Sequence, residues 1–204
     1  IPGGAANTVN NLLQLGAQVY PIGVLGNDDA GNEVFNYFHH RCASIEGLLL
    51  SNRVHTITKT RIMAGDDHTT KQQVIRIDRD PPVALTSDEE RRIGTYLARI
   101  APQLDALIVS DYGYNFVTQS LLPTIKQFSR RKTVVVDSRY RMKDFKGVTM
   151  VTPNLSEAEA FAGQEIKDAA TLLKAGKKIL KDVACIAVLI TRGNEGMTLI
   201  ERGK

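Results

Sequence analysis

The most informative stretch of the chain is residues 1–31, which read IPGGAANTVNNLLQLGAQVYPIGVLGNDDAG. Gly3 and Gly4 precede a helical pattern, and a glycine pair lets backbone N–H groups approach a ligand because no Cβ stands in the way. The helix is expected to place Asn7 in its first turn and to end at a capping Gly16. Each glycine feature alone is more typical of an ordinary turn or cap. Together they predict a small-molecule site at a helix start.

Apolar strand patterns alternate with helical patterns, which predicts an α/β fold with a mostly parallel sheet and helices on both faces. The first helix carries an apolar stripe that should be buried: Ala6, Val9, Leu12 and Leu13. Strands are predicted over 19–25, 106–110, 133–137, 148–152, 186–191 and 197–201. Helices are predicted over 119–129, 156–162 and 169–181, with another after the turn at 26–29. Four polar residues lie at or just past the ends of predicted strands, at the sheet edge where ligands of such folds bind: Asp111, Asp137, Asn154 and Arg192.

The middle of the chain follows a different pattern. Residues 56–64 and 72–78 interleave polar and apolar side chains around a turn at 65–68, which is typical of a β-hairpin. The prolines at 81–82 end this hairpin. An edge position in the main sheet is one interpretation of it.

A helix is expected to begin near Thr86. Thr86 and Glu89 have the spacing of a capping box, as do Ser87 and Glu90. These carboxylates are therefore predicted to cap the helix and not to catalyse a reaction.

Composition bounds the classes of function. The 204 residues are 43% hydrophobic, enough for one domain or one domain with a small appendage. The net charge of +4 permits anionic ligands such as phosphorylated sugars and nucleotides, and the scattered basic residues give no reason to expect nucleic acid. Cys42 and Cys185 show no metal spacing and are interpreted as free thiols in a reducing cytoplasm. No membrane span or signal peptide is recognised, so a cytoplasmic protein is expected.

The glycine-rich opening resembles the N-terminal signature of the ribokinase-like (PfkB) carbohydrate kinases, G-G-x-x-x-N followed by L-G and G-x-x-G-x-D-x-x-G. The resemblance implies that Gly3, Gly4 and Asn7 bind sugar hydroxyls, and an amide offers them both donors and an acceptor. It also implies a ribokinase-like fold with a small β-lid, for which residues 45–80 are the candidate. Residues 1–204 would then form an incomplete ribokinase-like kinase domain.

Asn154-Leu155-Ser156-Glu157 matches the N-x-x-E motif of the same family. The resemblance implies that Asn154 and Glu157 organise Mg²⁺ and the phosphates of ATP, largely through water. Magnesium prefers hard oxygen ligands and keeps several waters, which suits an amide and a carboxylate. Helix capping is the other interpretation of this segment, because Ser156 and Glu159 also have capping-box spacing. The two roles are compatible.

Thr191-Arg192-Gly193-Asn194-Glu195-Gly196 resembles the T-x-G-x-x-G turn under the nucleotide in these kinases. It implies nucleotide-binding roles for Thr191, Arg192, Gly193 and Gly196, since glycine permits backbone contact and arginine adds charge. Taken alone, the segment is an ordinary hairpin turn.

One branch of the family matches further segments: 56–61, 73–78, 110–112 and 152–157. These resemble the heptose-7-phosphate kinase domain of bifunctional ADP-heptose synthesis proteins. The resemblance implies that Asp111 faces the sugar and that Lys59, Arg61 and Arg76 bind its existing phosphate. Solvent-facing strand positions are the alternative for the three cations.

Two segments depart from that branch. Where it commonly has S-D-Y-A-K-G, this chain has Ser110-Asp111-Tyr112-Gly113-Tyr114-Asn115. Where it has D-P-K, this chain has Asp137-Ser138-Arg139, which keeps a positive charge at the third position. The lost lysines leave the substrate open.

The resemblance implies an ATP-dependent kinase that uses Mg²⁺ and phosphorylates a sugar phosphate, D-glycero-D-manno-heptose 7-phosphate, in lipopolysaccharide precursor synthesis. A homodimer and a fused or neighbouring nucleotidyltransferase are further expectations. The family's catalytic aspartate lies in a G-A-G-D segment expected after Lys204, so no catalytic base is assigned. The alternatives are another PfkB sugar or nucleoside kinase and a non-catalytic sugar or nucleotide sensor. A dinucleotide-dependent oxidoreductase is disfavoured because no G-x-G-x-x-G follows a predicted strand.

Overall fold

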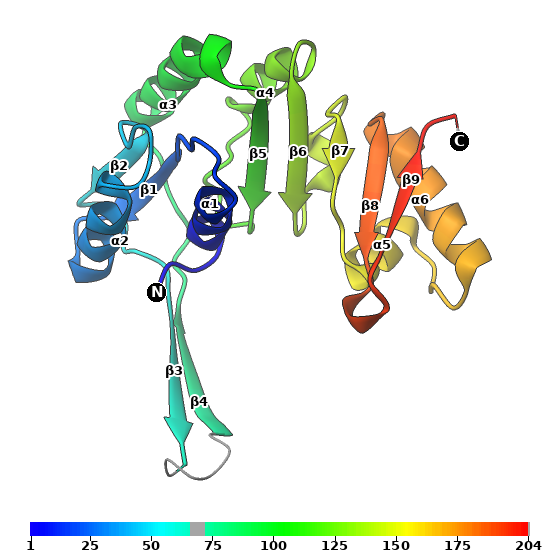
Figure 1. Cartoon of the computed structure of the whole chain (residues 1–204), viewed down its shortest axis with the longest axis horizontal. Helices are drawn as coiled ribbons and strands as arrows, with labels where there is room; N and C mark the ends of the chain where they lie inside the picture. The colour runs from blue at the N-terminus through cyan, green and yellow to red at the C-terminus, as the bar shows by residue number, and fades with distance from the viewer. Residues whose placement is uncertain (66–71, 204) are drawn as a thin grey trace. The chain divides into compact units, whose positions relative to one another are not determined.

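The computed structural model describes residues 1–65 and 72–203 of the chain. Its contacts form two compact units, Ile1–Glu89 and Glu90–Lys204. The described strands form a two-stranded β1-β2 sheet, a two-stranded β3-β4 sheet and a five-stranded β5-β6-β7-β8-β9 sheet (Figure 1). No helix in these described ranges has both the length and the apolar character needed to cross a membrane.

The first unit begins with helix α1 (Ala5–Gln14), which has a glycine at each end. Gly4 precedes it at φ +52° and Gly16 follows it at φ +82°, a backbone region that residues with a Cβ rarely adopt. The predicted helix start and cap are therefore confirmed. The predicted apolar stripe is only half-buried, at Ala6, Val9, Leu12 and Leu13, and no residue of α1 is fully buried.

Strand β1 (Gly23–Gly26) pairs in parallel with β2 (Leu48–Ser51). The strand predicted over 19–25 is therefore wrong in its first half. Pro21 has no N–H to donate and restricts the residue before it, so sheet pairing begins only at Gly23. Strand β2 is four residues long, too short for its pattern to stand out in the sequence.

Helix α2 (Asp29–His39) begins at the predicted turn. The side chain of Asp28 caps it, accepting from Gly31 N at 2.8 Å, and its second oxygen accepts from Thr56 N at 2.9 Å. Burial would raise the pKa of Asp28, but these hydrogen bonds and His55 outweigh it and lower the pKa. A Cβ on Gly31 would collide with the backbone of Gly26. The G-x-x-G-x-D-x-x-G motif thus caps α2 and allows its start to pack closely against the end of β1.

Strands β3 (Thr58–Ala64) and β4 (Gln72–Arg79) form the predicted antiparallel hairpin. They make a sheet of their own, so the interpretation as an edge of the main sheet is wrong. The turn predicted at 65–68 lies, beyond Gly65, outside the described residues.

Helix α3 (Ser87–Ile100) starts with the predicted capping box. Thr86 N donates to Glu89 Oε2 at 2.8 Å, and Glu89 N donates to Thr86 Oγ1 at 3.1 Å. The Thr86 bonds lower the pKa of Glu89. The assignment of this carboxylate to capping is confirmed.

The second unit is a mostly parallel α/β sheet. Four parallel strands are β5 (Ala106–Asp111), β6 (Thr133–Ser138), β7 (Met150–Val151) and β8 (Ala187–Thr191), and β9 (Met197–Glu201) is antiparallel to β8. The helices between them are α4 (Leu122–Ser129), α5 (Leu155–Ala162) and α6 (Ala169–Val183), and three short 3₁₀ turns are η1 (Ala101–Gln103), η2 (Met142–Asp144) and η3 (Gly193–Glu195). Helix α6 packs on β8 and β9, and α4 packs on β6 (Figure 1). The α/β expectation is confirmed.

Two predicted boundaries in this unit are wrong for identifiable reasons. Helix α4 begins at Leu122 and not at 119, because Pro123 fits the first helical turn, where its missing N–H costs nothing. Strand β7 has two residues instead of five. The extended backbone continues on both sides of it, since Thr149 N and Thr152 N donate to carbonyls of β6.

The core of this unit is aliphatic. Its fully buried side chains include Val134, Val136, Val151, Ile179, Val188 and Ile190. Side chains alternate along β6, so Val134, Val136 and Ser138 are buried while Asp137 is exposed. Successive residues at the end of one strand therefore face two different environments.

Candidate functional site

Asn154 and Glu157 lie at the start of α5 and hold one another in place. The Asn154 side chain accepts from Glu157 N at 2.9 Å, and Asn154 N donates to Glu157 Oε2 at 2.9 Å. The capping box predicted for Ser156 and Glu159 is therefore wrong, because the N-x-x-E pair itself makes the cap. Glu159 instead accepts from Ile166 N at 2.9 Å. Capping orders both motif side chains without a ligand.

The end of β8 lies beside this cap. Asn154 and Thr191 form a parallel β-bridge, and Thr191 N donates to Pro153 O at 3.0 Å. The turn after it closes through Arg192 N, which donates to Gly196 O at 2.8 Å. The predicted nucleotide-binding residues thus meet at the carboxyl-terminal edge of β7 and β8.

Both glycines of this turn have positive φ, +58° at Gly193 and +83° at Gly196. Arg192 is tied to Glu195 by an ion pair at 3.3 Å and by a bond from Nη2 to the Glu195 carbonyl at 3.2 Å. Its Nε is buried and has no hydrogen-bond partner in the described part of the chain. A buried donor without an acceptor costs free energy, so an anionic oxygen placed here would be favourable.

Asp137 adds a carboxylate to this region; its sequence position predicts the ligand-binding edge of the sheet but no particular role. Although Asp137 is exposed by surface area, the protein atoms around its carboxylate displace part of its water, and this desolvation, followed by the negative charges of Glu157 and Asp111, raises the pKa of Asp137. The sequence signal for it is a carboxylate at the end of an otherwise apolar strand. Asp137 and Glu157 together concentrate negative potential near the start of α5.

These side chains suit a magnesium ion that binds mainly through water. No group of three or more His, Cys, Asp or Glu side chains with metal-binding geometry occurs among residues 1–65 and 72–203. Mg²⁺ commonly binds through one or two carboxylates and keeps several waters. Glu157 and Asp137 are therefore suited to a water-mediated ion and not to a closed protein cage.

The predicted sugar-binding residues of the first unit are at the exposed start of α1. Gly4 has φ +52° and ψ −130° and provides no side-chain cap. Gly3, Gly4 and Asn7 are all exposed, and the side chain of Asn7 is in the first helical turn as expected. This helix start is open to a polar ligand.

The three predicted phosphate-binding cations share one face of the β3-β4 hairpin. Arg61 lies opposite Arg76 in the register, and Lys59 lies opposite Asp78. Asp78 accepts from Arg76 at 2.9 Å and from Lys59 at 3.3 Å. Burial would raise the pKa of Asp78, but these two cations lower it. With three cations and one carboxylate, the face remains positive.

The structure does not join these two clusters. Within the described ranges of the first unit, no hydrogen bond or ion pair links the α1 start to the hairpin cations. Asp111, also predicted to face the sugar, belongs to the second unit and is only 5% exposed.

The geometry defines a class of protein. A mostly parallel sheet whose carboxyl-terminal edge carries an Asn-Glu helix cap beside a glycine turn is the arrangement expected of a ribokinase-like kinase. The model of the pfkB family carbohydrate kinases matches residues 1–204, and the chain belongs to this family.

Solved structures share the fold. Phosphofructokinase-2 from Escherichia coli in complex with fructose-6-phosphate superposes with a TM-score of 0.72 at 16% identity, over 99% of this chain and 66% of that one. Ribokinase from Arabidopsis thaliana, complexed with ribose and ATP, gives a TM-score of 0.72 at 15% identity, over 98% of this chain and 63% of that one. The ribokinase-like fold expected from the sequence is confirmed.

Curated relatives point to one branch. The bifunctional protein HldE of Geobacter sulfurreducens is 36% identical over 204 residues, which are 98% of this chain and 41% of that protein. The bifunctional protein HldE of Helicobacter hepaticus is 31% identical over 205 residues, which are 99% of this chain and 42% of that protein. The chain therefore spans about two fifths of the length of these relatives.

Proposed function

We propose that this protein is an ATP-dependent kinase that transfers the γ-phosphoryl group to D-glycero-D-manno-heptose 7-phosphate. The observation that carries the proposal is the junction of the Asn154–Glu157 cap with the Thr191–Gly196 turn at one sheet edge. The likeness to bifunctional HldE proteins supports the choice of acceptor.

On the nucleotide side, the turn of Thr191, Arg192, Gly193 and Gly196 would contact ATP. Glycine at positive φ brings backbone N–H groups close to phosphate or ribose, and Arg192 adds a fixed charge. Asn154 and Glu157, with Asp137, would hold Mg²⁺ mainly through water. When bound, the ion neutralises charge on the phosphate oxygens during transfer.

On the acceptor side, Gly3, Gly4 and Asn7 would bind sugar hydroxyls. The positive hairpin face would bind the phosphate that the sugar already carries, and Lys59, Arg61 and Arg76, which share this face, would donate charge-assisted hydrogen bonds to it. The hairpin would act as the lid of the site. Asp111 would serve this side of the reaction as well.

The product would enter ADP-heptose and lipopolysaccharide precursor synthesis. A nucleotidyltransferase, fused to the kinase or encoded beside it, would act later in the same synthesis, after removal of the 7-phosphate that the sugar already carried. The relatives' description as bifunctional supports a second activity in the same chain.

Another PfkB-family kinase, acting on a neutral sugar or a nucleoside, is the second candidate. The observation in its favour is the loss of two lysines, since Tyr114 and Arg139 stand where the heptose branch has lysine. A sensor that binds without turnover is the third.

A substrate comparison separates these candidates. Full-length protein with ATP and Mg²⁺ is assayed on heptose 7-phosphate, fructose 6-phosphate, fructose and ribose. We expect the phosphorylated heptose to exceed any neutral sugar in kcat/KM by at least about tenfold, because each phosphate contact to a fixed cation contributes about 1.5–3 kcal/mol. Equal turnover of a neutral sugar rejects the heptose phosphate but keeps the kinase. Binding without any turnover favours the sensor.

A further inference from the structure

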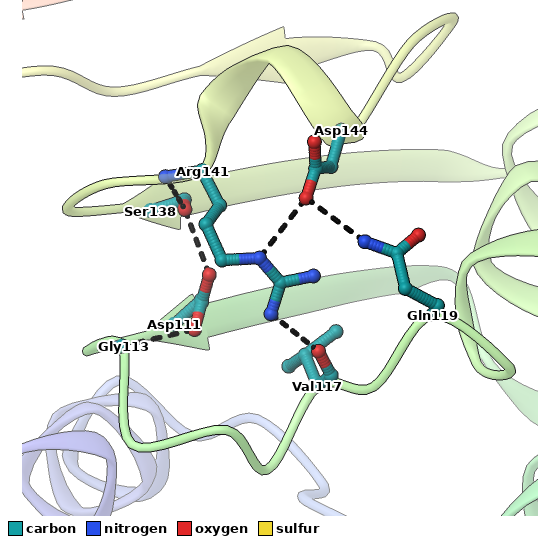
Figure 2. A network of polar contacts seen from close by, with 7 residues as sticks. All are labelled: Asp111, Gly113, Val117, Gln119, Ser138, Arg141 and Asp144. Atoms are coloured by element: carbon teal, nitrogen blue, oxygen red, sulfur yellow. Dashed lines mark hydrogen bonds and ion pairs between the residues drawn. The ribbon is translucent and has the colours of Figure 1, made fainter.

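A chain of hydrogen bonds joins the loops that follow β5 and β6 (Figure 2). Asp111, the last residue of β5, accepts from Gly113 N at 3.1 Å and from Ser138 Oγ at 2.8 Å. Each carboxylate oxygen therefore already has a partner inside the protein. At 5% exposure, the carboxylate leaves little surface for a sugar hydroxyl.

Ser138 is the centre of this chain. Its hydroxyl donates to Asp111 and accepts from Arg141 N at 3.2 Å, which uses its proton and one lone pair. Ser138 is 3% exposed, so water has little access to either bond. The heptose branch commonly has proline at this position, and proline has no hydroxyl to offer.

Arg141 extends the connection to the far end of the first loop. Its Nη1 donates to Val117 O at 2.8 Å, and its Nε donates to Asp144 at 3.0 Å. Gln119 also donates to Asp144, at 3.3 Å. Figure 2 shows the guanidinium lying between the two loops. The loops are thus connected at both ends.

A second departure from the branch supports the same connection. Gly113 stands where the branch has alanine, and a Cβ there would be 2.6 Å from the ring of Tyr140. Gly113 also has φ +80°, which disfavours any residue with a Cβ. Glycine at 113 and serine at 138 therefore both serve the contact between these two loops.

We propose that Asp111, Ser138 and Arg141 are positioning residues for the acceptor sugar, which hold loop 112–117 against loop 139–144 without touching the substrate. The proposal rests on the proposed kinase function. It assigns the effect to the acceptor because the proposed function places Asp111 on that side, and Asp111 is held by Ser138.

The test compares three variants of the full-length protein. Ser138→Ala removes the central hydroxyl, and Ser138→Thr keeps it. Ser129→Ala is the matched control. The Ser129 hydroxyl also donates a hydrogen bond, of 2.7 Å to Gly147 O, but Ser129 precedes β6, whereas the two loops follow β5 and β6. KM and kcat are measured for acceptor and ATP separately, and hydrogen exchange is measured over residues 112–117 and 139–144.

Ser138→Ala should raise the acceptor KM roughly tenfold or more, as expected when a reactant is slightly misplaced, with the ATP KM unchanged. Amides of both loops should exchange faster together, because each loses a shared anchor. Ser138→Thr should restore both readouts, and Ser129→Ala should change neither.

Two results overturn the proposal. One is wild-type exchange in both loops of Ser138→Ala, which does not depend on any activity. The other is an unchanged acceptor KM in Ser138→Ala while the wild type is active. If the wild type phosphorylates no sugar, the proposed function fails, and exchange alone decides whether the two loops are coupled.

Discussion

The nucleotide side and the acceptor side of the candidate site are built in different ways. On the nucleotide side, the motif residues are themselves structural parts, a helix cap and a closed turn. On the acceptor side, Asn7 is exposed and the cations project from a two-stranded hairpin, an element that is marginally stable alone in water. The proposed nucleotide side is therefore held by its own hydrogen bonds and is preformed, whereas the proposed acceptor residues are exposed on small elements.

The largest effect expected on the preformed side is that of Glu157→Gln. The amide keeps the reciprocal cap with Asn154 but loses the negative charge that we propose attracts Mg²⁺. We expect kcat to fall by about 10²- to 10³-fold and the Mg²⁺ requirement to rise, with little loss of stability. Steady-state kinetics over a magnesium titration measure this.

Glu159→Gln is the matched control for that variant. Glu159 has the same charge on the same helix but accepts from Ile166 N. Wild-type magnesium dependence in Glu157→Gln would leave that residue with a capping role only.

Arg61→Ala should have the next largest effect, on the acceptor side. Lys59 and Arg76 share Asp78, whereas Arg61 makes no ion pair with any described residue and is available to a phosphate. We expect KM for the sugar phosphate to rise about tenfold or more, the equivalent of one charge-assisted bond, with the ATP KM unchanged.

Arg79→Ala provides the comparison, because Arg79 lies opposite Thr58, on the other face of the hairpin. The ratio of activity on fructose 6-phosphate to fructose should fall in Arg61→Ala only. A similar fall in both variants would show that total charge, and not this face, matters.

Asn7→Ala tests the exposed helix start. A sugar hydroxyl that loses its amide partner should cost about 1–3 kcal/mol in kcat/KM for the sugar. The melting temperature should stay the same, because Asn7 is exposed and caps nothing. Unchanged kinetics would remove Asn7 from the acceptor site.

The sequence predicted best what depends on local chemistry. Glycines at helix ends, the Thr86–Glu89 cap and the apolar strand that became β6 were all placed correctly. The cap of α5 was predicted two residues late, at Ser156 and Glu159 instead of Asn154 and Glu157. Both pairs have capping-box spacing, and only the extended backbone at Asn154 selects between them.

Long-range contacts were not predictable in the same way. Asp111 and Ser138 are 27 residues apart, and their bond exists only because β5 and β6 are neighbours in register. The raised pKa of Asp137 likewise depends on where Glu157 comes to lie. Such features require the packed structure, because no period or motif in the chain specifies which strand ends meet.

The smallest expected effect is that of Asp137→Asn, which should raise the stability of the protein slightly while lowering its magnesium-dependent activity. Desolvation and the charges of Glu157 and Asp111 raise the pKa of Asp137 in the folded protein, so the folded state binds this proton more tightly than the unfolded state. Its contribution to stability is therefore lost as the pH rises through the folded pKa. At pH 7, Asp137→Asn should be slightly more stable than the wild type, on the order of 0.5 kcal/mol as is usual for exposed positions.

Thermal unfolding from pH 3 to pH 8 measures this difference. The stability difference between Asp137→Asn and the wild type should vanish at low pH, where the wild-type carboxyl is also neutral. At neutral pH, magnesium-dependent kinase activity should be lower in the variant. Asp182→Asn, in the last turn of α6 and before β8 begins, is the control. An Asp137→Asn variant that is less stable at pH 7 would mean that Asp137 makes a stabilising contact that outweighs its repulsion, and the preformed side would then lack the charge crowding that suits a cation.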